Sequence, residues 1–328
     1  MPSAPDPRFE GFDILQTTYK HVGDHGIRAD VLVPKTPYSG KRPVIIRFHG
    51  GGLVMGDSLY SAFSPRWLSD IALKYDAVLL TANYRLLPQA TGLDIYDDVE
   101  DFWAWLHSPA LQDLLEKHTT PVDVDLTRIL VVGESAGGLL TINTALAHAS
   151  QICAAIAAYP CIDFDSPDFT TPRTTILPFG QHTPETIIDE YLSSFNPKIA
   201  VSSTTEHRDI SFSMATIQHG RLGAWYAKGS EGSTRRHLLY PMERLEQPEI
   251  QIPRGGITIL HGRQDSVVPV TQSEPFVKRA REVTEGKPGG DKIVFVVRDG
   301  EHGFDQEVPY EEEWLRDALK IAVEAWLE

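Results

Sequence analysis

The chain has few cysteines, few asparagines and no long apolar run. Cys153 and Cys161 are its only cysteines among 328 residues, which excludes a disulfide framework as the basis of the fold. The three asparagines, Asn83, Asn143 and Asn196, begin no N-x-Ser/Thr glycosylation signal. No apolar stretch approaches the roughly 20 residues that span a bilayer, and the first residues lack the basic and apolar regions of a secretion signal. We therefore expect a soluble, cytoplasmic protein with no stable membrane association.

Positive charge is scarce as well. The chain has 30 Lys and Arg residues but 45 Asp and Glu residues, which gives a formal net charge of −15. Such a chain repels phosphate backbones, so nucleic acid is excluded as a partner. The sequence also lacks a His-Glu-x-x-His motif, a Cys-x-x-Cys motif and a lysine-bearing phosphate loop, so we expect neither a cofactor nor a metal ion. A homodimer is left open.

Short apolar runs rich in β-branched residues recur along the chain and predict strands. They cover 12–19, 28–34, 42–50, 77–84, 128–133, 153–160, 256–262 and 292–299. Segments of helical length lie between the later runs, at 65–75, 95–107, 135–149, 271–284 and 311–327. Strands that alternate with helices predict an α/β fold, here a mostly parallel eight-stranded sheet with helices on both faces.

The stretch "LVVGESAGGLL" at 130–140 runs from a predicted strand into a predicted helix. A serine on such a sharp turn takes a sparsely populated backbone conformation, so the residues two positions away must be small. Gly133 and Gly137 occupy those positions around Ser135. The helix that follows directs its free N–H groups toward the serine, where negative charge develops during acyl transfer.

A second glycine cluster follows the predicted strand at 42–50. In "HGGG", His49 precedes three glycines whose backbone can approach a ligand closely. The N–H groups of Gly51 and Gly52, together with that of Ala136, are candidates for an oxyanion hole. We expect His49 to hold this loop by hydrogen bonds and not to transfer protons.

A nucleophilic serine needs a base, and the base needs an orienting carboxylate. Asp265 and His302 each follow a predicted strand, and the chain order Ser135, Asp265, His302 is that of α/β-hydrolases. Asp299 and Asp305 compete for the role of the acid, but they lie too close to His302 along the chain to reach its ring correctly.

The strand and helix alternation breaks between 161 and 251. This segment has only two predicted helices, near 183–194 and 210–222, so we expect it to be a cap inserted into a core formed by 1–160 and 252–328. Leaving the sheet at the carboxyl ends of its strands, the cap should lie over Ser135. It carries a moderate number of large apolar side chains: Phe169, Phe179, Phe195, Phe212, Met214, Trp225 and Tyr226. We expect about half of them to form the cap's own core.

These residues resemble the hormone-sensitive-lipase-like branch of α/β-hydrolases, the fold-3 carboxylesterases. The matching landmarks, in order, are "HGGG" at 49–52, "NYRLLP" at 83–88, "DDVEDFWAWL" at 97–106, "GESAGG" at 133–138 and "EHGF" at 301–304. The resemblance implies that Ser135 is the nucleophile, Asp265 the acid and His302 the base, with Gly51, Gly52 and Ala136 as the oxyanion hole. It also implies a structural role for Arg85.

The predicted function is that of a serine hydrolase that cleaves a carboxylic ester of a small to medium acyl or aromatic substrate through an acyl-enzyme intermediate. Arylformamidase, lactonase, peptidase and thioesterase activities remain alternatives on the same three residues. The loop "HGRQDSVVP" resembles that of peptidase-like and dienelactone-type hydrolases, and Glu134 stands where many family members have Asp. A receptor that only binds a small molecule is a further alternative. The gibberellin receptor, which resembles this family, lacks the catalytic histidine, whereas this chain keeps His302.

Overall fold

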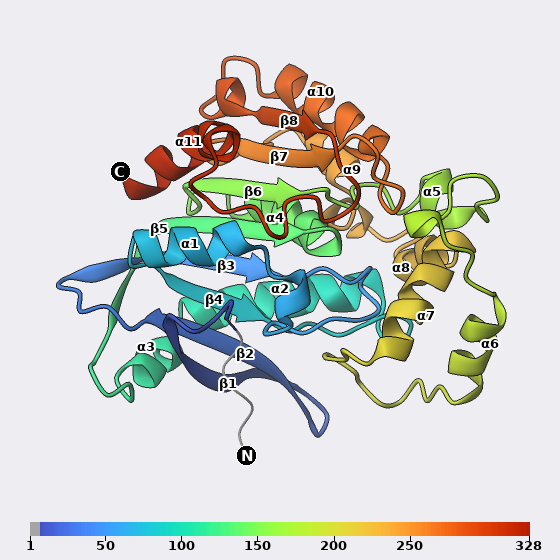
Figure 1. Ribbon diagram of the computed structural model, residues 1–328, viewed down its shortest axis with the longest axis horizontal. Coiled ribbons are helices and arrows are strands. Elements are labelled where there is room, and N and C mark those ends of the chain that lie inside the picture. Colours follow the sequence, from blue (N-terminus) through green and yellow to red (C-terminus); the bar gives the residue numbers. More distant parts are fainter. Residues whose placement is uncertain (1–6) are drawn as a thin grey trace.

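A computed structural model describes residues 7–328. Eight strands form one sheet in the order β1-β2-β4-β3-β5-β6-β7-β8 (Figure 1). Their bounds are β1 (Phe12–Val22), β2 (His25–Pro34), β3 (Lys41–Phe48), β4 (Val78–Ala82), β5 (Asp123–Glu134), β6 (Ala154–Ala158), β7 (Ile257–Gly262) and β8 (Val294–Arg298). Strand β2 is antiparallel to β1 and β4, and every other neighbouring pair is parallel. The predicted sheet is confirmed.

Helices cover both faces of the sheet. One face packs against α1 (Arg66–Lys74) and α11 (Glu313–Leu327), and the other against α2 (Gly92–Leu106), α4 (Ala136–Ala147) and α10 (Ser273–Val283). Side chains alternate between the two layers along β3, where Val44 and Ile46 join the cluster of α2 and α4 while Ile45 joins that of α1 and α11. The central strands are buried on both faces, which explains their continuous apolar runs. Helix α3 (Pro109–Leu115) was not predicted.

The segment between β6 and β7 lies beyond the carboxyl ends of the parallel strands (Figure 1). It contains α5 (Pro167–Thr170), α6 (Thr186–Ser193), α7 (His207–Gln218), α8 (Leu222–Ala227) and α9 (Pro241–Leu245). The prediction of only two helices here is wrong. The helix predicted near 210–222 corresponds to α7, which ends at Gln218. Gly220 adopts a φ of 63° between α7 and α8, and a Cβ there would lie 2.5 Å from the backbone N of Thr171. The left-handed glycine ends α7.

Buried side chains of this segment extend the core of the sheet. Phe169, Phe212 and Tyr226 belong to the same apolar cluster as Leu139 of α4. Near the end of the segment, Leu245 and Ile250 pack in the cluster of α10. Three of the aromatic residues noted in the sequence are therefore fully buried, and they anchor the segment to the sheet.

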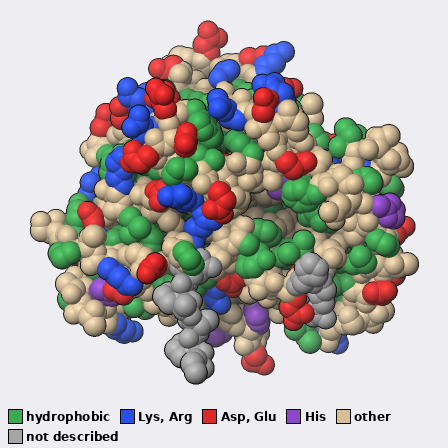
Figure 2. Space-filling view, in the orientation of Figure 1, with side chains coloured by type: hydrophobic (Ala, Val, Ile, Leu, Met, Phe, Trp, Pro, Cys, Tyr) green, Lys and Arg blue, Asp and Glu red, His purple; other side chains and the backbone are tan. Residues whose placement is uncertain are grey.

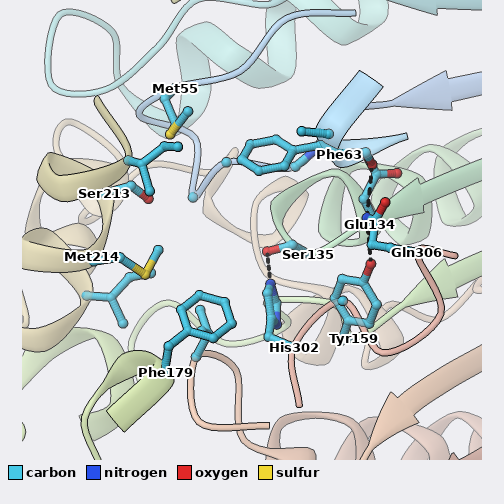
Figure 3. Close-up of a pocket in the computed structure, with 18 residues that line it drawn as sticks. Met55, Phe63, Glu134, Ser135, Tyr159, Phe179, Ser213, Met214, His302 and Gln306 are labelled. Atoms are coloured by element: carbon cyan, nitrogen blue, oxygen red, sulfur yellow. Dashed lines mark hydrogen bonds between the residues drawn. The ribbon is translucent and has the colours of Figure 1, made fainter. Parts of the chain in front are cut away.

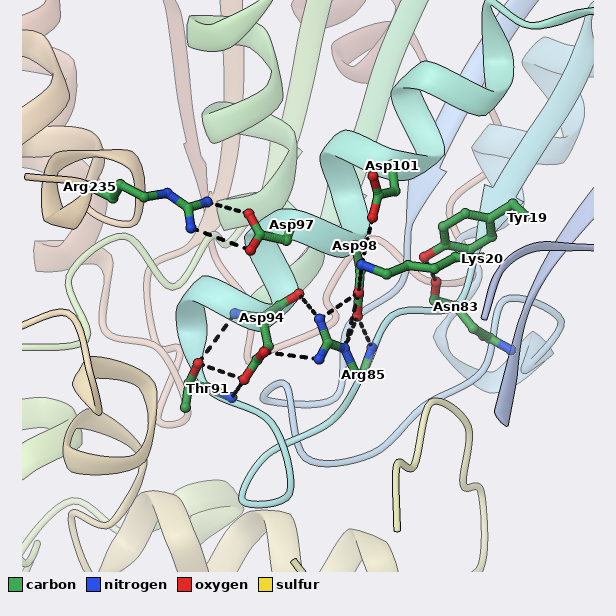
Figure 4. A network of polar contacts seen from close by, with 10 residues as sticks. All are labelled: Tyr19, Lys20, Asn83, Arg85, Thr91, Asp94, Asp97, Asp98, Asp101 and Arg235. Atoms are coloured by element: carbon green, nitrogen blue, oxygen red, sulfur yellow. Dashed lines mark hydrogen bonds and ion pairs between the residues drawn. The ribbon is translucent and has the colours of Figure 1, made fainter. Parts of the chain in front are cut away.

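A buried ion-pair network holds the loop after β4 against α2 (Figure 4). The Arg85 guanidinium donates hydrogen bonds to both carboxylate oxygens of Asp98, which is fully buried, and to Asp94. Lys20 of β1 pairs with Asp98 as well, at 2.6 Å. Separately from this network, Arg235 forms a half-exposed ion pair with an aspartate of α2, which links the segment between β6 and β7 to the same helix. Arg85 thus has a structural role, since it holds the loop after β4 against α2.

Acidic and basic side chains are interspersed over the face of the molecule in Figure 2, and neither sign forms a broad continuous patch there. The excess of acidic residues is therefore distributed on this face. None of the helices within residues 7–328 combines the length and the apolarity that a membrane span requires.

Candidate active site

Ser135 lies on the turn between β5 and α4 in a strained conformation, with φ 57° and ψ −120°. The two flanking glycines are required by close packing. A Cβ at Gly133 would lie 2.3 Å from the carbonyl oxygen of Gly137, and a Cβ at Gly137 would lie 2.0 Å from the carbonyl oxygen of Phe48. Both distances are far below van der Waals contact, so a larger residue at Gly133 would push β5 from α4, and one at Gly137 would push α4 from β3.

The structure brings Ser135, Asp265 and His302 together at the carboxyl ends of the strands. Nε2 of His302 lies 3.1 Å from Ser135 Oγ, and Nδ1 lies 2.8 Å from Asp265 Oδ2. This geometry suits an Nδ1–H that donates to the carboxylate and an Nε2 that accepts from the serine hydroxyl. The Asp265 side chain is fully buried, and that of His302 is largely buried.

Backbone groups fix the position of the Asp265 carboxylate. Its Oδ1 accepts hydrogen bonds from the N–H groups of Val267 and Val268, at 2.9 and 2.7 Å. This leaves Oδ2 directed at His302. Charge-assisted bonds of this kind stabilise the ionised carboxylate and hold its orientation.

Glu301 joins the acid loop to the base loop. It accepts hydrogen bonds from the N–H groups of Ser266 and His302, at 2.6 and 2.8 Å, and from the Ser266 hydroxyl. One carboxylate thus sets the spacing of the two loops. The sequence analysis assigned no role to Glu301, because a glutamate beside a histidine carries no distinct signal.

The glycine loop approaches Ser135 from β3. Gly51 and Gly52 both have positive φ, of 108° and 63°, and a Cβ at Gly51 would lie 2.2 Å from the Met55 carbonyl oxygen. Within residues 7–328, the N–H groups of Gly51, Gly52 and Ala136 donate no hydrogen bond. The loop and the start of α4 therefore leave amide donors unused beside the serine hydroxyl.

A buried ion pair fastens this loop to the serine turn. The Arg47 side chain pairs with the Glu134 carboxylate, and Oε1 of Glu134 also accepts a hydrogen bond from the N–H of Gly50 at 3.1 Å. Burial raises the pKa of Glu134 to about 7, because desolvation outweighs the attraction of Arg47. The sequence analysis noted Glu134 only as a departure from Asp and missed Arg47.

His49 is fully buried and lies outside the lining of the cavity that contains Ser135. Its ring stacks on Tyr84 with centroids 4.4 Å apart, and its Nδ1 lies 2.8 Å from the Gly50 carbonyl oxygen. Burial lowers the pKa of His49 to about 4, so the ring is neutral near pH 7. The Tyr84 hydroxyl donates to the His49 carbonyl at 2.6 Å, which braces the start of the glycine loop.

A cavity of about 220 Å³ opens beside Ser135 (Figure 3). Residues of the core that line it include Gly51, Met55, Phe63, Glu134, Tyr159 and Gln306. The segment between β6 and β7 contributes Phe179, Ile210, Ser213, Met214 and Ile217. Of the large apolar residues noted in that segment, only Phe179 and Met214 line the cavity. Across residues 7–328, no group of three or more His, Cys, Asp or Glu side chains is arranged to hold a metal ion.

Comparison with known proteins agrees with this architecture. A family described as alpha/beta hydrolase fold matches residues 45–221, which include the glycine loop and Ser135. The chain is 33% identical over 331 residues to a Phoma sp. protein named "Probable carboxylesterase M8", an alignment that covers 97% of this chain and 98% of the relative. The chain belongs to the hormone-sensitive-lipase-like α/β-hydrolase fold-3 family.

Further relatives extend the comparison. "Probable carboxylesterase clz11" of Cochliobolus lunatus is 32% identical over 202 residues, which cover 59% of this chain and 86% of that protein. Among solved structures, butyrate-bound esterase 2 of Thermogutta terrifontis superposes with a TM-score of 0.58 at 19% identity, and the alignment covers 98% of this chain and 95% of that one. Esterase B of Lactobacillus rhamnosis, inhibited by a tributyrin phosphonate, gives 0.58 at 15% identity, with 97% and 85% covered. These structures share the fold.

Proposed function

We propose that the protein hydrolyses carboxylic esters through an acyl-enzyme on Ser135. The observation that carries the proposal is the His302 ring, which bridges Ser135 Oγ and Asp265 Oδ2 inside a cavity. His302 takes the hydroxyl proton as Oγ attacks the ester carbonyl, and then gives it to the leaving alcohol. A water molecule, activated by the same histidine, then attacks the acyl group and releases the acid. Asp265 orients the ring and stabilises its positive charge.

The amides of Gly51, Gly52 and Ala136 form the oxyanion hole in this proposal. Attack on the carbonyl moves negative charge onto its oxygen, and fixed N–H donors stabilise that charge without rearranging. The start of α4 adds the positive end of its dipole at the same place. Glu134 supports the loop through Gly50, which fixes the direction of the neighbouring amides.

Phosphonate labelling tests covalent catalysis directly. A p-nitrophenyl alkylphosphonate should release one equivalent of p-nitrophenol and add its mass to the peptide that contains Ser135, because the phosphonate mimics the tetrahedral intermediate. Mass spectrometry of a digest locates the adduct. A protein that binds the phosphonate reversibly, with no adduct at Ser135, would be a receptor. Cleavage rates on a panel of esters, amides, lactones and thioesters then show which type of bond the protein cleaves fastest.

The segment 161–251 is proposed as a cap over a core of 1–160 and 252–328. Support comes from the side chains that it places in the cavity, including Phe179 and Met214. The cavity volume of about 220 Å³ is below the roughly 300–1,000 Å³ that is usual for pockets of drug-sized ligands. The substrate is therefore proposed to have a short acyl chain or one compact ring.

Chain length should accordingly control the rate. We expect p-nitrophenyl acetate and butyrate to be cleaved much faster than the palmitate, because a long chain cannot be enclosed beside Ser135. Initial rates over a series of chain lengths measure this, together with a scan of substrate concentration through the critical micelle concentration. Preference for palmitate, or a rate jump above that concentration, would indicate a lid that opens at interfaces.

Substitution at Gly51 should damage catalysis more than binding. Gly51→Ala places a Cβ against the Met55 carbonyl, so the loop shifts and its N–H groups no longer point at the oxyanion. We expect kcat to fall by about 10²–10³ with a smaller change in KM. The matched control is Gly40→Ala, where φ is 92° but no heavy atom lies within 4 Å of the new Cβ. An unchanged kcat with weaker binding in Gly51→Ala would make the loop a wall of the cavity only.

A cytoplasmic location and a homodimer remain proposals. Cys153 and Cys161 are both free and buried, which suits a reducing compartment. Fractionation of expressing cells tests the location, and sedimentation of the purified protein tests the dimer.

A further inference from the structure

The cavity beside Ser135 has two chemically different ends (Figure 3). The mainly apolar end is lined by Met55, Phe179, Ile210, Met214 and Ile217, with Ser213 as its one polar side chain among the cavity residues of α7. The polar end is lined by Glu134, Tyr159 and Gln306. In the close-up, the labelled residues of the two ends lie on opposite sides of Ser135. A substrate whose carbonyl is placed at Ser135 therefore extends toward both environments.

Gln306, which lines the polar end, has an acceptor oxygen that no other group in the described part of the chain uses. Its Nε2 lies 3.3 Å from the Phe63 carbonyl oxygen and 3.4 Å from the Tyr159 hydroxyl. A carbonyl oxygen only accepts hydrogen bonds, so the amide nitrogen must face Phe63 and the amide oxygen must point elsewhere. That oxygen is buried and has no hydrogen-bond partner among residues 7–328. A buried acceptor without a donor destabilises the free protein and gains most from a ligand that supplies one.

The backbone holds Gln306 in place. Its carbonyl oxygen accepts from the N–H of Arg66 at the start of α1, at 2.9 Å, and from the Arg8 side chain, at 3.0 Å. Its own N–H donates to the Gly303 carbonyl at 3.0 Å, within the loop that carries His302. The backbone of Gln306 is thus tied to the loop that carries the proposed base.

Glu134 adds acceptor oxygens to this end without adding net charge. Only 2% of the residue is exposed, yet it lines the cavity, and Arg47 pairs with its carboxylate. Because Arg47 balances the carboxylate, the pair carries no net negative charge and gives a cation little advantage, while the carboxylate and amide oxygens do not attract an anion. A neutral hydrogen-bond donor suits the polar end best.

We propose that the polar end binds a hydroxyl group of the substrate, so that the protein prefers esters that carry a hydroxyl on one side of the scissile bond. Gln306 Oε1 accepts the hydroxyl proton, with Glu134 as the neighbouring acceptor. The apolar remainder of the substrate occupies the apolar end. This inference rests on the proposed ester hydrolysis and specifies its substrate class.

Matched ester pairs test the preference on each side of the bond. On the acyl side, p-nitrophenyl 3-hydroxybutanoate is compared with p-nitrophenyl 3-methylbutanoate, which replaces the hydroxyl by a methyl group. On the alcohol side, 3-hydroxypropyl butanoate is compared with butyl butanoate. We expect kcat/KM to favour the hydroxyl ester by about tenfold or more in at least one pair. Equal or lower values for both hydroxyl esters would overturn the proposal.

Variants assign the preference to one end of the cavity. Gln306→Met keeps the length of the side chain but removes its acceptor, so the ratio between the paired esters should fall to near one. Ser213→Ala is the matched control, since Ser213 is a polar residue among the cavity residues from α7. Its ratio should match that of the wild type. A preference that persists in Gln306→Met, or that is lost in Ser213→Ala instead, would place the hydroxyl elsewhere and contradict the proposal.

Two further measurements distinguish a failure of the hydroxyl preference from a failure of the proposed ester hydrolysis. Calorimetric dissociation constants of the paired esters on Ser135→Ala should show the same preference, and they do not depend on turnover or on the folding of Gln306→Met. Butyrylcholine is compared with its uncharged isostere, 3,3-dimethylbutyl butanoate, and a larger preference in this pair than in the hydroxyl pairs would show a cation site and overturn the proposal. Failure to cleave any ester, the apolar ones included, would refute the proposed function; cleavage without hydroxyl preference would refute only the inference.

Discussion

Ser135→Ala is expected to lower kcat for p-nitrophenyl butyrate by about 10⁴–10⁶-fold, because no acyl-enzyme can form without the hydroxyl. His302→Ala should cost a similar factor, since the two residues act as one unit across the 3.1 Å contact between Nε2 and Oγ. The double variant should therefore be hardly worse than either single variant. Steady-state rates on folded protein, checked by circular dichroism, measure all three. Full activity in either single variant would remove Ser135 and His302 from the mechanism.

A second nucleophile beside Ser135 provides the control. Cys161 Sγ lies 3.8 Å from Ser135 Oγ, so a thiol could in principle take over the covalent step. Burial raises the pKa of Cys161 to about 12, which keeps the thiol protonated and unreactive at neutral pH. Cys161→Ala should therefore retain most of the turnover and still take up the phosphonate. A loss as large as that of Ser135→Ala would transfer the covalent role to the cysteine.

The sheet could be predicted because its central strands are buried on both faces. A strand such as β3 directs apolar residues into two separate helix layers, which gives three apolar residues in a row at 44–46 shortly before the glycine loop. The segment between β6 and β7 gave a weaker signal. Its helices α5, α8 and α9 have four to six residues each, too few for a helical repeat to stand out. Tertiary contacts, not local pattern, stabilise them.

The distinction between local sequence pattern and tertiary contact applies to the active-site residues as well. Ser135 and the glycine loop could be found because a strained turn and a close backbone approach demand particular residues at fixed spacing. The Arg47–Glu134 pair depends on strand register instead. Arg47 of β3 is aligned with Val132 of β5, and Glu134 follows two residues later on the same face of the sheet. Only the alignment of two strands that are far apart in sequence brings the charges together, and the sequence does not state that alignment.

The role of Gln306 could not be predicted from the local sequence either. A glutamine four residues after a predicted base has many possible roles on a loop. Its acceptor becomes informative only when the Phe63 carbonyl, 243 positions away along the chain, fixes which way the amide points. Substrate preference thus resides in contacts that join distant segments.

Asp265→Asn is the second substitution with a large expected effect, a loss of about 10⁴-fold in kcat, as is usual when the carboxylate of such a triad becomes an amide. The backbone N–H groups of Val267 and Val268 need an acceptor, so they would hold the new amide oxygen at the place of Oδ1. The amide nitrogen would then face His302 Nδ1 and donate to it. This forces the proton onto Nε2, which can no longer accept from Ser135. Rates across pH 5 to 9 measure the loss.

Asp299→Asn is the comparison that can contradict this assignment, because Asp299 is one of the two competing acids, each three positions from His302 in the sequence. Its side chain is 82% exposed and pairs with Arg263 on the surface, where solvent screens the interaction. Its replacement should leave kcat within the error of the assay and shift stability little. A severe loss in Asp299→Asn, with near-normal turnover in Asp265→Asn, would mean that the 2.8 Å contact between Asp265 and His302 is structural and that the base is oriented by a different carboxylate.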